Sequence, residues 1–204
     1  MPPTERATTA VASLAGRGEF DGMKLIRSTL LIIPALVLSA SAVLGQDKPR
    51  VSPHETINAT VGDAKITIAY GRPYTKDPKS GEKRKIWDGL VPYGKVWRMG
   101  ANEATLLTTD KEVSIGGSDI APGSYSLFLL PAEDGAKLIV NKQTGQWGTK
   151  HDESQDLVRI DLKKQALDKS VDQFTIVVDQ TGTDRVLKLK WENTEYSAPI
   201  AGKK

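Results

Sequence analysis

The feature that most limits the fold of this chain is a two-residue alternation of apolar and polar side chains. In residues 64–70, Ile66, Ile68 and Tyr70 fall on one face. Side chains of a β-strand point alternately to its two faces, so this period is typical of a half-buried strand. Runs of the same kind cover residues 104–109, 113–115, 124–130, 137–141, 157–162, 174–178 and 185–191. We therefore predict an all-β fold, a single antiparallel β-sandwich domain over residues 51–200.

Turn-forming residues separate these runs. Gly116-Gly117, Pro122-Gly123 and Asp134-Gly135 either tolerate a positive φ or preset a turn. Residues 71–85 form a long polar connection, which a compact domain usually keeps for function or mobility. A short helical turn is expected near residues 165–167.

Residues 23–45 have the pattern of a secretory signal peptide. Lys24 and Arg27 give it a basic start, and residues 30–38 are apolar. A transmembrane helix needs roughly 20 predominantly apolar residues, and this stretch is shorter. We expect cleavage, export to the periplasm or extracellular space, and no membrane span afterwards; an uncleaved anchor is the alternative.

The predicted cleavage site lies among small residues. Cleavage after Ala42 or after Gly45 fits, and the second leaves a polar N-terminus. Residues 1–22 precede the basic start and show no structural pattern. We predict that they are a disordered start-site extension and that Met23 is the true initiator.

The composition excludes several kinds of chemistry. The chain has 204 residues, no cysteine and a formal net charge of +3. Disulfides, thiol nucleophiles and cysteine zinc sites are therefore excluded. Basic and acidic residues are interspersed, so no nucleic-acid partner is expected, and residues 83–85 (Lys-Arg-Lys) are interpreted as a solvated loop. No cofactor motif is present, and no cofactor is expected.

Unusual polar and aromatic residues gather in residues 89–105. Glycines interrupt regular structure there, so the segment is predicted to be a folded loop. An arginine in such a loop can bind a carboxylate or phosphate through two parallel hydrogen bonds. The candidate ligand-binding residues are Trp97, Arg98, Asn102, Glu103 and, in a later loop, Trp147.

Structural roles are the alternatives for these residues. Arg98 and Glu103 can form a buried ion pair that fixes the loop, because buried charges usually occur in pairs. Tryptophans in a β domain usually pack in the core, and Trp191, on the apolar face of its strand, is assigned there. Trp147, between polar and small residues, is the better candidate for contact with a ligand.

Several segments resemble one bacterial family. Residues 52–55, 70–73, 89–105 and 122–128 are similar to the hallmark segments of the bacterial domain-of-unknown-function family 2911. The string Trp-Arg-x-Gly-Ala-Asn-Glu at residues 97–103 is its most specific part. The resemblance spans about residues 51–200 and implies an exported β-sandwich without an established activity. Residues 74–82 look like an extra piece within the pattern.

Two functions follow from these observations. The first is a non-catalytic module that binds a small molecule, glycan or protein through residues 89–105. The second is a hydrolase with a His54/Glu103 acid–base pair, Tyr93 as a further catalytic candidate, or a single metal at His54. The chain has only two histidines, so His54 and His151 are the only histidine ligands available, and a hydrogen-bonded structural histidine is the alternative for each. The enzyme requires His54 and Glu103 to converge on an open pocket.

Overall fold

The computed structural model describes residues 50–181 and 184–203. The predicted extension 1–22 and signal peptide 23–45 lie outside these residues. The described elements are β1 (His54–Val61), β2 (Ala64–Gly71), β3 (Thr105–Thr109), β4 (Val113–Ile115), β5 (Ser118–Ile120), β6 (Gly123–Pro131), β7 (Ala136–Asn141), the 3₁₀ turn η1 (Glu153–Gln155), β8 (Asp156–Thr181) and β9 (Asp184–Gly202). None of the helical structure in this part is long and apolar enough to cross a membrane.

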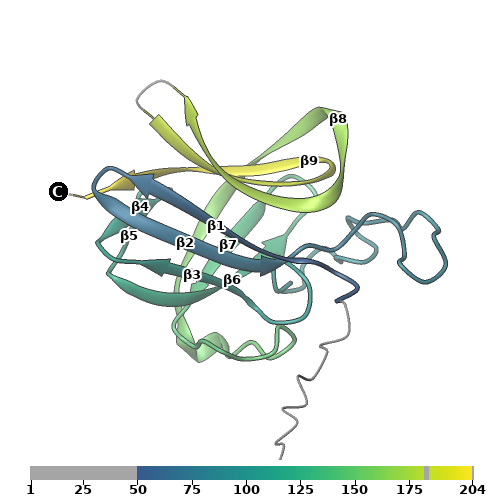
Figure 1. Ribbon diagram of the computed structural model, residues 1–204, viewed down its shortest axis with the longest axis horizontal. Coiled ribbons are helices and arrows are strands. Elements are labelled where there is room, and N and C mark those ends of the chain that lie inside the picture. The colour runs from purple at the N-terminus through teal and green to yellow at the C-terminus, as the bar shows by residue number, and fades with distance from the viewer. Residues whose placement is uncertain (1–49, 182–183, 204) are drawn as a thin grey trace, which may run out of the picture. The chain divides into compact units, whose positions relative to one another are not determined.

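All strands join one continuous sheet in the order β1-β2-β3-β6-β7-β8-β9-β4-β5. Every neighbouring pair is antiparallel. The first part of β8, up to Leu162, pairs with β7, and its later residues pair with β9. The long β8–β9 pair lies against β1, so that β8 carries the sheet from one layer into the other (Figure 1). The antiparallel all-β prediction is confirmed, with one folded sheet in place of two separate ones.

The predicted inward faces of the strands are buried. Ile66, Ile68 and Tyr70 of β2 are at most 2% exposed. Tyr70 meets Phe174 of β8 edge to face, with 5.8 Å between the ring centroids. Phe174 in turn packs against Trp191 of β9 at 5.8 Å, so aromatic side chains join the two layers of the folded sheet.

Turn chemistry fixes the short hairpin of β4 and β5. Gly116 and Gly117 between them have φ values of 55° and 84°. A two-residue turn with positive φ at both positions matches the right-handed twist of the flanking strands, and glycine adopts it without a Cβ clash. Ile115 and Ser118 pair on either side of the predicted Gly116-Gly117 turn, and β5 itself was not predicted.

The prediction of a helical turn at residues 165–167 is wrong. These residues belong to β8, where Lys163–Ala166 pair with Thr194–Ser197 of β9. Backbone pairing with a long partner strand outweighs the weak helical preference of three residues. β1 was not predicted either, because Ile57 is its only large apolar side chain before Val61.

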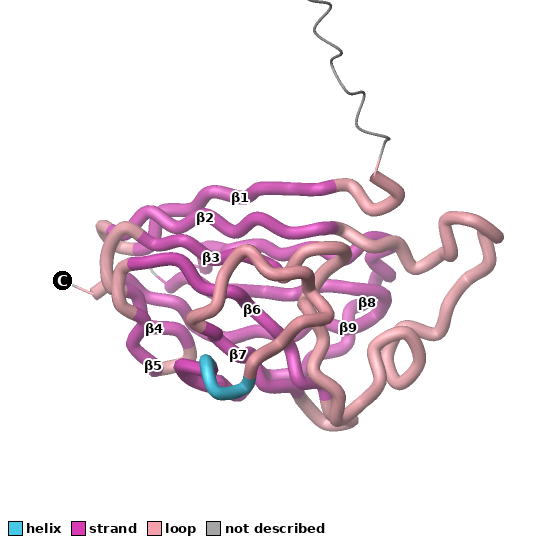
Figure 2. The backbone as a smooth tube through the Cα atoms, turned by 90° about the horizontal axis from the view of Figure 1, so that it is seen from below, coloured by secondary structure: helices cyan, strands magenta, loops and turns pink. Residues whose placement is uncertain are grey.

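The long connection between β2 and β3, residues 72–104, lies at one end of the sheet. Figure 2 shows loop segments gathered at that end, while short turns join the strands at the other. This connection contains residues 89–104 of the candidate loop, and Thr105 begins β3. The fold therefore presents the candidate loop at an open end of the sheet, where loops usually carry function.

Candidate functional site

Trp97 is attached to the sheet by its backbone. Its N–H donates to the Leu129 carbonyl at 2.7 Å, and its carbonyl accepts from the Leu129 N–H at 2.7 Å. Beyond it the chain turns sharply, with positive φ at Met99 (52°) and Asn102 (66°). A bridge to β6 followed by left-handed turns gives the residues of this loop fixed positions at the sheet end.

The tryptophans of the loop form the outer part of an aromatic cluster. The Trp97 ring stacks on that of Trp191 at 5.6 Å and 18°. Trp87 meets both rings edge to face, at 6.4 Å from Trp97 and 6.3 Å from Trp191. Trp191 is 1% exposed, as expected for a core residue, whereas Trp97 is partly exposed. Trp97 thus covers the core and also presents ring surface to the loop region.

A pocket of about 320 Å³ opens beside this cluster. Trp97, Arg98 and Asn102 line it from the loop, and Trp191 lines it from the core side. Arg84, in the middle of the Lys-Arg-Lys sequence, also lines it. The pocket therefore combines three of the five predicted ligand-binding residues with two that the sequence analysis had assigned to other roles.

Arg98 stands in the pocket wall without a partner. No hydrogen bond or ion pair joins its side chain to the described part of the chain, and its Nε is buried and unpartnered. Loss of hydration lowers the pKa of Arg98. The side-chain stem packs on Gly148, where an added Cβ would lie 2.1 Å from Arg98 Cδ. The fold thus holds a cationic group in place while leaving its charge uncompensated.

The alternative prediction of a buried Arg98–Glu103 pair is wrong. Glu103 pairs with Arg50, whose Nη1 donates to both carboxylate oxygens at 2.8 and 2.9 Å. Asn102 between the two predicted partners adopts a left-handed conformation, and Glu103 lines a different pocket from Arg98. The hydrogen bonds from Arg50 hold the pKa of Glu103 below its ordinary value.

His54 and Glu103 line a second pocket of about 210 Å³. His54 is exposed at the start of β1 and opposite Gly71 of β2. The charge interaction with His54 acts in the same direction on the pKa of Glu103. Carboxylates that serve as general bases near neutral pH usually have a raised pKa, and the lowered pKa of Glu103 is the opposite of that tuning.

The remaining acid–base and metal candidates lie apart from this pair. Tyr93 lies by Lys164, whose Nζ is 5.8 Å from the Tyr93 ring centroid, and it is not among the residues that line the pocket of His54. Within residues 50–181 and 184–203, no three histidine or carboxylate side chains are grouped as a metal would require. The hydrolase hypothesis therefore has two of its residues in one pocket and neither a raised carboxylate pKa nor a third ligand in the described chain.

His151 belongs to a separate polar network beside η1. Its Nε2 lies 2.7 Å from Asp156 Oδ1, and the Asn141 amide donates to the same carboxylate oxygen at 2.8 Å. Arg159 donates to the other oxygen at 2.7 Å. Burial acts to raise the pKa of Asp156, but these hydrogen bonds outweigh it, and its pKa is lowered. This is the hydrogen-bonded structural role that the sequence analysis gave as the alternative for His151.

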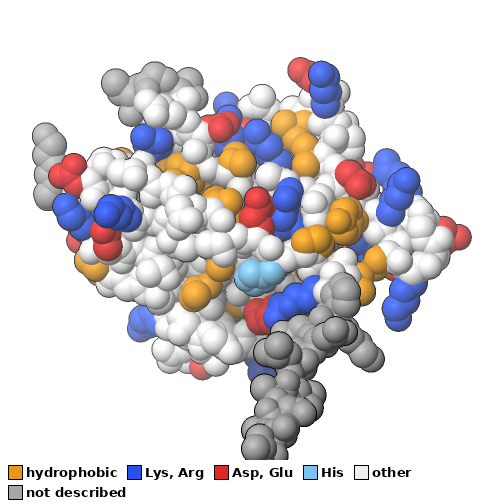
Figure 3. Space-filling model, in the orientation of Figure 1, with side chains coloured by type: hydrophobic (Ala, Val, Ile, Leu, Met, Phe, Trp, Pro, Cys, Tyr) orange, Lys and Arg blue, Asp and Glu red, His pale blue; other side chains and the backbone are white. Residues whose placement is uncertain are grey.

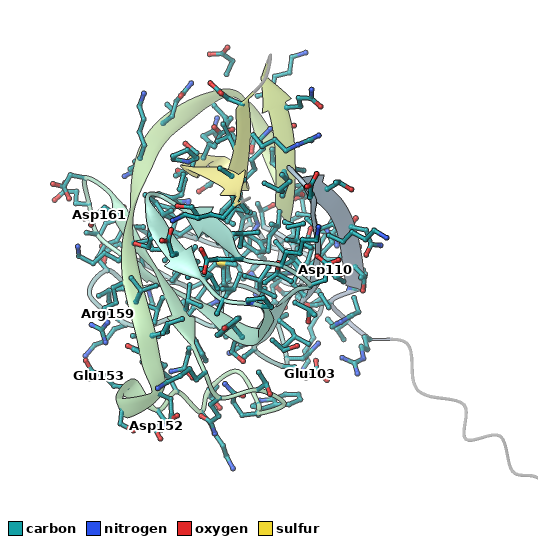
Figure 4. The ribbon with its side chains drawn as sticks, turned by 90° about the vertical axis from the view of Figure 1, so that its left-hand side faces the viewer. Glu103, Asp110, Asp152, Glu153, Arg159 and Asp161 are labelled. Atoms are coloured by element: carbon teal, nitrogen blue, oxygen red, sulfur yellow. The ribbon has the colours of Figure 1, made fainter. Side chains whose placement is uncertain are left out.

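Charged side chains are distributed over the molecule without a large field of one sign on the face seen in Figure 3. Figure 4 shows Glu103 well separated from Asp152, Glu153 and Arg159, which lie together at η1.

Trp147 is 51% exposed and bridges by its backbone to Glu103. Trp147 therefore lies next to Glu103 and is exposed to solvent.

Sequence reasoning missed Arg84 and Trp191 as pocket residues. In the structure Arg84 is partly buried and Ile86 is buried, whereas Lys83 and Lys85 are exposed. The sequence shows only that Arg84 and the apolar Ile86 alternate with two lysines, which is a weak signal for an inward Arg84. Nothing in the sequence connects position 191 to the loop, since that contact depends on the folding of β9 over the sheet.

Comparison with known families agrees with this architecture. The sequence pattern of the family described as "Protein of unknown function (DUF2911)" matches residues 52–200. The chain belongs to the DUF2911 family. The resemblance carried by residues 97–103 is thus confirmed, and the DUF2911 segment contains all of the pocket residues named above. Searches of curated proteins and of solved structures give no match.

Proposed function

We propose that this DUF2911 protein is a non-catalytic binding module whose site is the pocket beside Trp97, Arg98 and Asn102. The observation that carries the proposal is the unpartnered, partly buried guanidinium of Arg98 in the wall of an open pocket. Buried polar groups are almost always hydrogen-bonded, so such an exception needs an explanation. A bound ligand supplies the missing partner.

The size and walls of the pocket favour a small molecule. Its volume of about 320 Å³ lies at the lower end of the range for ligand pockets, roughly 300–1,000 Å³. Aromatic surface from Trp97 together with a few polar groups is the usual composition of such a site. A glycan or a protein segment that enters the pocket with one side chain or one sugar ring is the larger alternative.

We place this function outside the cytoplasm. The basic start, apolar stretch and small residues of 23–45 support export, and the lack of cysteine fits a fold held by its core alone. Expression of the whole chain in a bacterium, followed by fractionation and N-terminal sequencing of the product, tests this. A mature N-terminus after Gly45 or Ala42 supports export; a cytoplasmic product that retains residues 23–45 refutes it.

The tryptophans provide the test of the binding site. A set of acidic, basic and neutral fragments is screened by NMR against ¹⁵N-labelled protein, and the indole N–H signals are the readout. Trp97 and Trp191 line the pocket, and the exposed Trp147 serves as the internal control. We expect a subset of fragments to shift the signals of Trp97 or Trp191 and to leave that of Trp147 in place. Fragments that shift Trp147 alone, or no signal at all, would refute the proposed site.

A further inference from the structure

The pocket wall contains two arginines and no carboxylate. Arg84 and Arg98 both line it, and no aspartate or glutamate does. Within the described residues neither arginine has an ion pair within 4.0 Å. Asp77 lies outside the pocket lining but is close enough to Arg84 for the two charges to interact. The charge of Arg84 is therefore partly balanced, whereas loss of hydration alone acts on Arg98.

Three buried donors in this wall lack an acceptor. They are Nε of Arg84, Nε of Arg98 and Nε1 of Trp191, and Trp191 itself is 1% exposed. All three are N–H groups, which only an acceptor can satisfy. The Arg84 side chain does reach one acceptor, since its Nη2 donates to the Tyr74 carbonyl, and this contact fixes the guanidinium in the wall. The residues of the wall as a whole therefore carry fixed positive charge and N–H donors without acceptors.

The lining of the pocket also has an apolar part. The partly exposed Trp97 ring stacks on Trp191, and Leu90, which is 44% exposed, also lines the pocket. A ligand that satisfies the arginines must therefore also place carbon atoms against an indole ring. Flat apolar groups and aromatic rings make the most favourable contacts with such a surface.

We infer that the pocket takes a small organic anion, with a carboxylate or phosphate group facing Arg84 and Arg98 and an apolar, aromatic body against Trp97. Arginine binds both anions through paired N–H donors. Both head groups act as hydrogen-bond acceptors, which is what donors without acceptors require. The inference rests on the proposed function and specifies the ligand class of the same pocket.

Isothermal titration calorimetry with matched probes tests this inference. The probes are 3-phenylpropionate, phenyl phosphate and the neutral 3-phenylpropan-1-ol, in a buffer free of phosphate and sulfate. Hydrogen bonds to charged groups are stronger than those between neutral groups, so we expect at least one anion to bind about tenfold or more tightly than the alcohol. The ratio between 3-phenylpropionate and phenyl phosphate assigns the head group. This comparison uses the unaltered protein, so it does not depend on any variant folding.

Two variants with the same change in charge complete the test. Arg98→Gln should reduce the preference for the anion by about tenfold. Arg185→Gln, in β9 beside a different pocket, should retain it. An alcohol that binds as tightly as the anions, or a preference lost equally in both variants, would overturn the inference and leave the proposed binding site standing. If the fragment screen finds ligands at Trp97 but neither anion binds, the inference again fails alone; if no fragment and no probe binds, both fail.

Discussion

Replacing Arg98 by methionine should make the unliganded protein more stable. A buried donor without a partner costs about 1–3 kcal/mol, and Arg98 has such a donor at Nε. Methionine keeps the unbranched stem that packs on Gly148 and removes the charge. Because the rest of the guanidinium borders an open pocket and stays partly hydrated, we expect the lower end of that range. The free energy of unfolding should rise by about 1 kcal/mol, which raises Tm by about 2–4 °C for a domain of this size.

Urea unfolding followed by tryptophan fluorescence, with calorimetry for Tm, measures this change. Arg159→Met is the matched control, because Arg159 donates to Asp156 and Glu153 and its loss should lower stability. If Arg98→Met lowers the free energy of unfolding by about 1 kcal/mol or more, Arg98 stabilises the loop. The reasoning that the cation is retained for a ligand would then be refuted.

Three further substitutions, the first with a matched control, test other parts of the structure. Gly148→Ala should destabilise by about 1–3 kcal/mol, because the new methyl group overlaps Arg98, whereas Gly135→Ala, whose nearest contact is at 3.5 Å, should show a much smaller change in Tm. Tyr70→Phe should lower the free energy of urea unfolding by about 1–3 kcal/mol, because the hydroxyl accepts a buried backbone N–H at 2.9 Å; an unchanged value would contradict that role. The pKa of Asp156 is lowered in the fold, so its contribution is present above its ordinary pKa of about 3.9 and is lost as pH falls through the folded-state value. Asp156→Asn should therefore flatten the acid side of a stability–pH profile, and a profile parallel to that of the unaltered protein would show that the network does not contribute.

The strands could be predicted wherever burial differs sharply between the two faces. β2 has fully buried side chains at alternate positions, and its sequence shows the alternation. β1 is an edge strand whose inward residues are only partly buried before Val61, so its sequence carries little apolar signal. The extension of β8 through residues 165–167 depends on pairing with β9, which a local pattern does not contain.

The candidate site was predictable in its local part. Trp97, Arg98 and Asn102 are close in sequence, and they line one pocket. Glu103 is adjacent in sequence and lies in another pocket, because the left-handed turn at Asn102 separates them and because Arg50 provides its partner. Such a change of direction follows from backbone angles, and residue types indicate it only weakly.

The position of β9 sets the order in which the fold can be completed. Among the described strands, β4 pairs with β5 and with the far end of β9, where Ile115 meets Ile200. The β4–β5 hairpin therefore keeps one open edge until β9 has paired with it, and pairing over so long a separation is slow. Since Trp191 also belongs to β9, the pocket is complete only once this strand has folded over the sheet.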